Sequence, residues 1–192
     1  MSYKDLKSYQ QATIVYDYTV EFCNLYIVPD KSNRINKSYR TADQMVQAAR
    51  SGKQNIAEGS ANPTSEKSEL HLTGVARASF DELLEDYEDF LRQRGLRQWD
   101  KDSPEARDAR ALAYKSNRSY RTYRSYIDNA ETAANCAICL IHQTNFLLDR
   151  QLKSLEEQFV KRGGFTENLR RRREDEKKRK LGGGMRGFYD KK

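Results

Sequence analysis

Apolar side chains recur at intervals of three and four residues along four long stretches of this chain, and this spacing limits its fold more than any other feature. Residues spaced in this way share one face of an α-helix, whereas a half-buried strand would show strict alternation, which appears nowhere. The stretches run over about 3–26, from 38 or 41 to 58, from a cap at 64 or 65 to 94, and from 119 or slightly later to 161. Only 10 Gly and 3 Pro occur among the 192 residues, as long helices require. We therefore predict an all-α protein.

The second of these helices has an inner face made mostly of small residues. The predicted buried faces of the first two helices are Ile14, Val15, Tyr18, Phe22 and Leu25, and then Met45, Ala48, Ala49, Gly52 and Ile56. Small side chains let helix axes come close together, which predicts that the second helix is clamped between its neighbours. The alternative is that Ala and Gly merely tolerate burial there.

Glycine and proline mark where the helices end. Gly59 suits a left-handed helix terminus, Gly95 ends the third helix, and Gly163-Gly164 stops the fourth. Ser103 followed by Pro104 is typical of an N-cap with proline in the first helical turn, which predicts a short helix over 105–114.

Together these signals predict an up-down four-helix bundle over residues 1–164 with an insert at about 95–118. We expect a basic tail over 165–192 that is partly helical, over about 166–180, or flexible. Gly182-Gly183-Gly184 should begin a flexible end.

The positive charge of the chain is concentrated in this tail. The net charge is +7, and residues 165–192 hold 11 Lys and Arg against 5 Asp and Glu, so the bundle is nearly neutral. No apolar run is long enough to cross a bilayer, and no signal-peptide core appears at the start. Three cysteines are too few for a disulfide framework. These features predict a cytoplasmic protein without membrane attachment.

Two basic regions are candidates for binding nucleic acid. In 118–126, Arg and Tyr each recur every third residue, so on a helix Arg would hold phosphates while Tyr stacks on bases. The alternative is that the Tyr rings pack on the bundle and Arg faces water. In the tail, two runs of four cations are split by Glu174-Asp175-Glu176, and they either attract nucleic acid or form a solvated, ion-paired helix. The candidate residues are Lys115, Arg118, Tyr120, Arg121, Tyr123, Arg124, Arg170, Arg171, Arg172, Arg173, Lys177, Lys178, Arg179 and Lys180.

No residue pattern indicates catalysis or a cofactor. Cys136-x-x-Cys139 with His142 has the spacing of a metal site on a helix, but its neighbours are Ala, Ile and Leu, which favours plain core packing. No phosphate-binding glycine loop and no nucleophile paired with a base can be identified. We therefore expect a protein that is not an enzyme, with no metal and no cofactor.

The end of the second helix carries a recognisable motif, Gln47-Ala48-Ala49-Arg50-Ser51-Gly52-Lys53-Gln54-Asn55-Ile56-Ala57-Glu58-Gly59. It resembles the "R-A-A-x-S-I-x-x-N-I-A-E-G" signature of a bacterial four-helix-bundle family. That family includes the 23S ribosomal RNA intervening-sequence proteins and the accessory variability determinant of diversity-generating retroelements. Asn55, Ile56, Ala57, Glu58 and Gly59 carry the most specific part of the match, and Ser65 to Leu91 resembles the family's third helix.

The later part of the chain is similar to the family's four-helix-bundle suffix variant. The matching residues are Glu131, Ala134-Asn135, Ile138, Leu140-Ile141-His142-Gln143, Leu147-Leu148-Asp149, Gln151-Leu152, Leu155-Glu156, Phe159 and Gly163-Gly164-Phe165. The insert and the tail depart from the family pattern. The resemblance implies a ring of subunits, typically a pentamer, and for the retroelement branch binding to RNA or DNA and to a reverse transcriptase.

These observations lead to two hypotheses. The first is a homo-oligomeric bundle that binds nucleic acid, as an accessory to a reverse transcriptase. The second is a structural, self-assembling module that binds protein and no nucleic acid, which the nearly neutral bundle favours. Asn55 and Glu58 would then make a polar contact across a subunit interface, or else mark the end of the helix with Glu58 paired to a nearby cation.

Overall fold

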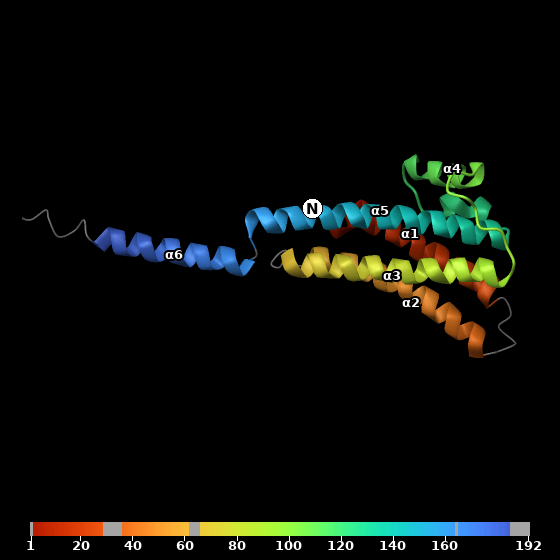
Figure 1. The fold of residues 1–192 in the computed structure, drawn as a ribbon, viewed down its shortest axis with the longest axis horizontal. Coiled ribbons are helices and arrows are strands. Elements are labelled where there is room, and N and C mark those ends of the chain that lie inside the picture. Colours follow the sequence, from red (N-terminus) through yellow and green to blue (C-terminus); the bar gives the residue numbers. More distant parts are fainter. Residues whose placement is uncertain (1, 29–35, 62–65, 164, 185–192) are drawn as a thin grey trace, which may run out of the picture.

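The computed structural model describes residues 2–28, 36–61, 66–163 and 165–184, and within these ranges the chain forms helices and turns but no β-strand. The predicted all-α class is therefore confirmed. In chain order the elements are η1 (Tyr3–Asp5), α1 (Lys7–Phe22), η2 (Cys23–Ile27), α2 (Asn36–Ala61), α3 (Glu66–Gln93), α4 (Pro104–Ala111), η3 (Leu112–Tyr114), η4 (Tyr120–Tyr126), α5 (Ala130–Arg162) and α6 (Phe165–Gly184). Figure 1 shows their arrangement.

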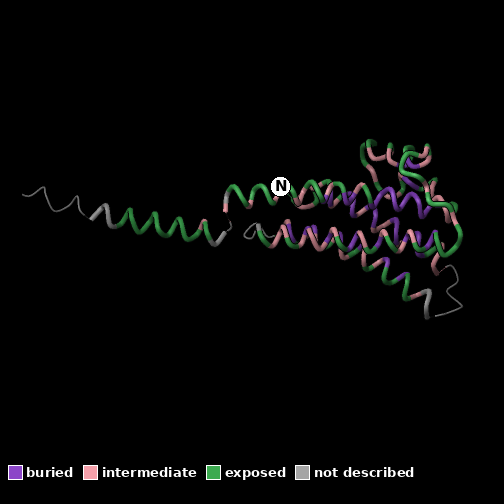
Figure 2. The backbone as a smooth tube through the Cα atoms, in the orientation of Figure 1, coloured by how far each residue is buried: buried purple, intermediate pink, exposed green. Residues whose placement is uncertain are grey.

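Four of these helices enclose the core. Helix α1 packs on α2 and α5, and α3 packs on the same two helices from the other side. The buried backbone lies along the lines where they meet, as Figure 2 shows. Helix α6 differs, because it projects beyond the end of the bundle and makes no extensive contact with any other described element (Figure 1).

The small residues of α2 allow a close approach to α3, as the sequence predicted. A Cβ atom added at Gly52 would lie 2.5 Å from Cε2 of Phe80, so the Phe80 ring occupies the space that any side chain at 52 would need. Gly59 serves a similar purpose, because an added Cβ would lie 3.3 Å from Cβ of Leu72. The prediction that Gly59 ends the helix is wrong: α2 continues to Ala61.

The predicted buried face of the first helix is wrong at its C-terminal end. The helix widens into a π-helical turn, η2, whose i to i+5 bonding rotates the following residues around the axis. Leu25, predicted to be buried, is consequently 44% exposed, while Cys23 is buried. Just before the turn, the Phe22 ring packs edge-on against Tyr87 and Phe90, with centroids 4.8 Å apart in both pairs.

The segment between α3 and α5 is longer than predicted. The fourth long helix does not begin near residue 119; α5 begins at Ala130, after Asn129 accepts hydrogen bonds from the backbone N–H groups of Glu131 and Thr132. Asn129 is therefore the N-cap, a role for which its side chain is well suited. The preceding residues 120–126 form a 3₁₀ helix.

Glycines end α3 and α5 as predicted, but not α6. Gly95 and Gly163 have φ values of 63° and 71°, a left-handed region in which other residues are strained. Gly182-Gly183-Gly184, in contrast, lie within the last turn of α6, so the prediction that the helix stops before them is wrong. The short insert helix begins as expected, with Ser103 accepting from the Ala106 N–H and Pro104 in the first turn.

Candidate nucleic-acid interface

The tyrosines of the Arg/Tyr segment face the bundle and not solvent. In η4, residues three apart lie on one side of the helix, because a 3₁₀ helix has three residues per turn. Tyr123 is fully buried, and Tyr120 and Tyr126 are half-buried against the core. The Tyr123 ring therefore cannot stack on a base, and for this residue the alternative interpretation, in which the ring packs on the bundle, is the correct one.

The arginines of this segment divide into one structural and two exposed residues. The Arg118 guanidinium donates to Oε1 of Gln11 on α1, with Nη1 2.7 Å from that oxygen. This bond holds the insert against the bundle, and the role of Arg118 in phosphate binding stays a prediction. Arg121 and Arg124 are exposed, as is Lys115, and none of the three forms an ion pair within the described part of the chain.

Tyr114 is not among the residues that the sequence pattern predicted to bind nucleic acid. It was expected to end a short helix, and it is instead the last residue of η3, with 93% of its surface exposed. No periodic signal separates it from the packed tyrosines that follow, because its exposure comes from the course of the chain around it.

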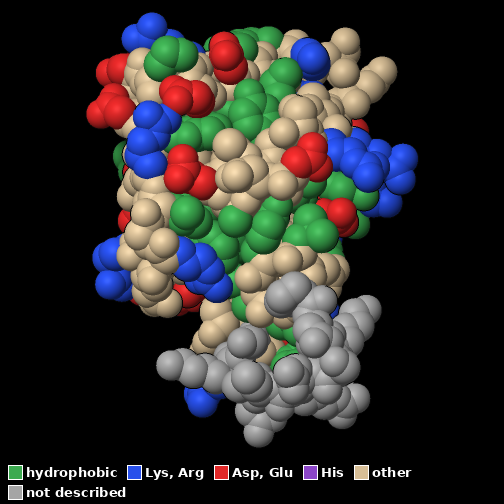
Figure 3. All heavy atoms as spheres, turned by 90° about the vertical axis from the view of Figure 1, so that its right-hand side faces the viewer, with side chains coloured by type: hydrophobic (Ala, Val, Ile, Leu, Met, Phe, Trp, Pro, Cys, Tyr) green, Lys and Arg blue, Asp and Glu red, His purple; other side chains and the backbone are tan. Residues whose placement is uncertain are grey.

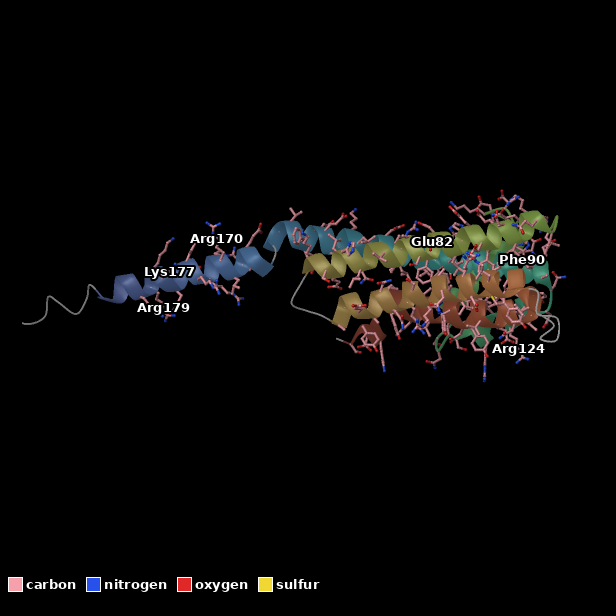
Figure 4. The ribbon with its side chains drawn as sticks, turned by 90° about the horizontal axis from the view of Figure 1, so that it is seen from below. Glu82, Phe90, Arg124, Arg170, Lys177 and Arg179 are labelled. Atoms are coloured by element: carbon pink, nitrogen blue, oxygen red, sulfur yellow. The ribbon has the colours of Figure 1, made fainter. Side chains whose placement is uncertain are left out.

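The eight candidate cations of the tail lie on α6, and all eight are exposed. On this helix Arg170, Arg173, Lys177 and Lys180 follow a spacing of three, four and three, which places them on one face. We call these four residues the basic stripe. Figure 4 shows Arg170 and Lys177 on one side of α6 and Arg179 on the other.

Acidic residues border this face on both sides: Glu174 lies four residues after Arg170, and Glu176 lies four residues before Lys180. Glu174, Asp175 and Glu176 alternate around the other sides of the helix with the remaining cations, Arg171, Arg172, Lys178 and Arg179. Arg170 pairs with Glu174 at 3.0 Å at the edge of the stripe, but both side chains are largely exposed, so this pair is weak. The stripe is therefore an exposed row of cations bordered by carboxylates.

The two basic regions do not form a single surface. Arg124 lies at one end of the molecule and the basic stripe projects from the other, as Figure 4 shows. Any polyanion that contacts both must extend along the length of the bundle, and a short ligand contacts only one.

The family-like motif is built into α2 and does not end it. The Asn55 amide donates to the backbone oxygen of Ser51 at 2.9 Å, and Ile56 is fully buried. Glu58 is exposed and forms no ion pair within the described residues, so the expected pairing with a nearby cation is absent there. Ala57 is half-buried.

The cysteines are core residues. Cys136 and Cys139 are buried on α5, whereas His142 is exposed. Burial raises the pKa of both thiols above their usual range. Burial, with the charges of Asp86 and Asp43, raises the pKa of Cys23 to about 12. Among the described residues, no three His, Cys, Asp or Glu side chains are placed to hold a metal ion.

These shifts predict a loss of stability at alkaline pH. In the unfolded chain the thiols ionise near their ordinary pKa of about 8.5, whereas in the folded protein they keep their protons to higher pH. The contribution of the buried, protonated thiols to the free energy of unfolding is therefore fully present below about pH 8.5. It should fall as the pH rises towards 12. Urea midpoints at pH 8, 9, 10 and 11 measure this, and Cys23→Ala should make the decline shallower. A midpoint that stays constant over this range would contradict the prediction.

A groove between α2 and α3 is strongly acidic. It has a volume of about 570 Å³ and is lined by Gln44, Gln47, Ala48, Ser51, Ser79, Glu82, Glu85, Asp86 and Asp89. Burial raises the pKa of Asp86, and its three acidic neighbours add to the effect. The charge of this face repels polyanions.

Within the residues that the structure describes, no helix combines the length and the apolar composition needed to cross a lipid bilayer.

Comparison of the chain with family models, with curated protein sequences and with solved structures finds no match.

Proposed function

We propose that this chain is a non-enzymatic, oligomeric helical-bundle protein that binds nucleic acid through the basic stripe of α6. The observation that carries the proposal is the exposure of Arg170, Arg173, Lys177 and Lys180 along one face of a helix that projects from the bundle. A helix without an apolar face gains little from packing on its own bundle. Its surface is suited to a partner that is recognised by charge.

The length of the stripe matches a phosphate backbone. At 1.5 Å per residue, Arg170 and Lys180 are separated by about 15 Å along the helix axis. Four cations over this length can each meet a phosphate and release its condensed counterions. Such contacts position a nucleic acid but do not read its sequence. We therefore expect binding to RNA or DNA with strong salt dependence and weak sequence preference.

The experiment compares two variants with equal changes in charge. In the first, the four residues of the stripe are replaced by Gln; in the second, Arg171, Arg172, Lys178 and Arg179 are replaced by Gln. Gln keeps the helix propensity close to that of Lys and Arg. Filter binding of a 30-nucleotide RNA or DNA at several salt concentrations gives the slope of log affinity against log salt.

Loss of the stripe should make this slope shallower by about 3, since four phosphate contacts are removed. The control variant should change it much less, because its cations lie on the other sides of the helix, away from the stripe. Equal slopes for the wild-type protein and the stripe variant would refute the proposal. Equal losses in both variants would show that net charge alone attracts the nucleic acid.

The resemblance of residues 47–59 to the retroelement-associated family supports two further parts of the proposal. We propose that the protein assembles with itself, with five subunits as the expected number, and that it acts as an accessory to a reverse transcriptase. Native mass measurement tests the subunit number. Co-purification with the product of a neighbouring reverse-transcriptase gene tests the second part.

A second candidate function is a self-assembling protein-interaction module without nucleic-acid binding. The observation that favours it is at the end of the bundle away from α6, where hydrophobic side chains reach the surface between charged ones, as Figure 3 shows. Leu25 is 44% exposed there, next to half-buried Tyr26 and Ile27. Leu25→Glu should dissociate the native particle if this end joins subunits. Absence of any salt-sensitive RNA or DNA binding by the wild-type protein would select this function.

A further inference from the structure

Tyr114 stands apart from every other tyrosine that the structure describes. The others are buried or half-buried, whereas 93% of the surface of Tyr114 is exposed. A phenol ring in water leaves a large apolar surface unpaired, and nothing within the described part of the chain covers it. Its position therefore suits a ligand with a flat, unsaturated surface.

The segment that carries Tyr114 is held firmly on both sides. Before it, the backbone oxygen of Arg110 accepts from Nε2 of Gln143 on α5, 3.3 Å away. After it, Arg118 bonds to Gln11 on α1, and Tyr123 is fully buried. A ring presented by an anchored segment loses little freedom when it binds, which favours affinity.

The segment that carries Tyr114 is rich in cations and lies between Asp108 and Asp128. Residues 109–127 contain five Lys and Arg and no Asp or Glu. Lys115 directly follows Tyr114, and Arg121 and Arg124 are also exposed. An exposed aromatic ring within a cationic segment is the combination that binds single-stranded nucleic acid, in which the bases stack and the phosphates pair with cations.

We propose that Tyr114 stacks on an unpaired base of a single-stranded nucleic acid while Lys115 and Arg121 bind the adjacent phosphates. This inference rests on the proposed function and extends it. The basic stripe at the other end of the molecule supplies attraction to phosphates in general. The Tyr114 segment adds a preference for single strands, because the bases of a duplex are already stacked on one another.

The experiment measures binding of a labelled 30-nucleotide oligothymidylate and of a duplex of the same length at one salt concentration. Tyr114→Ala should weaken single-strand binding about tenfold, which corresponds to the loss of one stacked base. Duplex binding and the salt slope should not change. Tyr114→Trp should retain single-strand affinity, and fluorescence quenching of the new Trp on binding would report the stacking directly. Because Tyr114 is almost fully exposed, these changes should leave the fold intact.

Phe146→Ala is the matched control. Phe146 is 60% exposed on α5, outside the cationic segment, so its loss should not affect binding of either ligand. Unchanged single-strand affinity in Tyr114→Ala would overturn the inference, as would an equal loss for the duplex or a wild-type protein that does not bind oligothymidylate. The stripe variants decide the proposed function separately, because they act through the salt slope and leave Tyr114 in place.

Discussion

Gly52→Ala is expected to destabilise the wild-type protein but to stabilise a Phe80→Ala variant. The added Cβ would lie 2.5 Å from Cε2 and 2.7 Å from Cζ of Phe80, whose ring is fully buried. Overpacking of this kind costs about 1–3 kcal/mol. Phe80→Ala alone should cost about 3–5 kcal/mol through the cavity that it leaves. In that background the new methyl group meets no ring, and Ala should gain about 1 kcal/mol over Gly in a helix.

Gly74→Ala provides the matched control for this cycle. Gly74 also lies within a long helix, α3, but an added Cβ would have no neighbour within 4 Å. It should therefore stabilise the protein by about 1 kcal/mol in either background. Urea denaturation of the single and double variants gives the free energies of unfolding. Equal effects of Gly52→Ala and Gly74→Ala in the wild-type protein would contradict the close packing of α2 on α3 at Gly52.

Asn135→Ala is expected to detach the start of the insert from the bundle. The Asn135 side chain is almost fully buried on α5, and its oxygen accepts from the Trp99 backbone N–H at 2.6 Å. Its amide donates to the backbone oxygens of Arg97 and Glu131, at 2.8 and 2.9 Å. Each buried polar group left without a partner costs about 1–3 kcal/mol. The free energy of unfolding should consequently fall by about 2–4 kcal/mol.

The only tryptophan of the chain reports this change directly. The Trp99 ring packs edge-on against Tyr126 with centroids 6.0 Å apart, so release of the segment should shift its fluorescence to the red before the bundle unfolds. Lys101→Ala, two residues after Trp99 and exposed, should leave the spectrum unchanged. Identical spectra for Asn135→Ala and the wild-type protein would show that Asn135 does not hold the segment.

The sequence by itself determined the elements whose causes are local. Periodic apolar residues predicted α2 and α3 almost to their ends, and the change of backbone conformation at Gly95 and Gly163 ends α3 and α5. Ser103 and Pro104 predicted the start of α4 in the same way. In each case a few neighbouring residues decide the outcome, because capping and helix propensity act over a single turn.

Only the tertiary structure decided how the candidate site is arranged. The tyrosines of η4 face the core and Arg118 bonds to α1, because residues more than a hundred positions away supply the partners. Local spacing also could not predict the π-helical turn that exposes Leu25, or the exposure of Tyr114. These outcomes depend on which surfaces meet after the helices have packed, since burial and hydrogen bonding across the bundle outweigh the preference of any single segment.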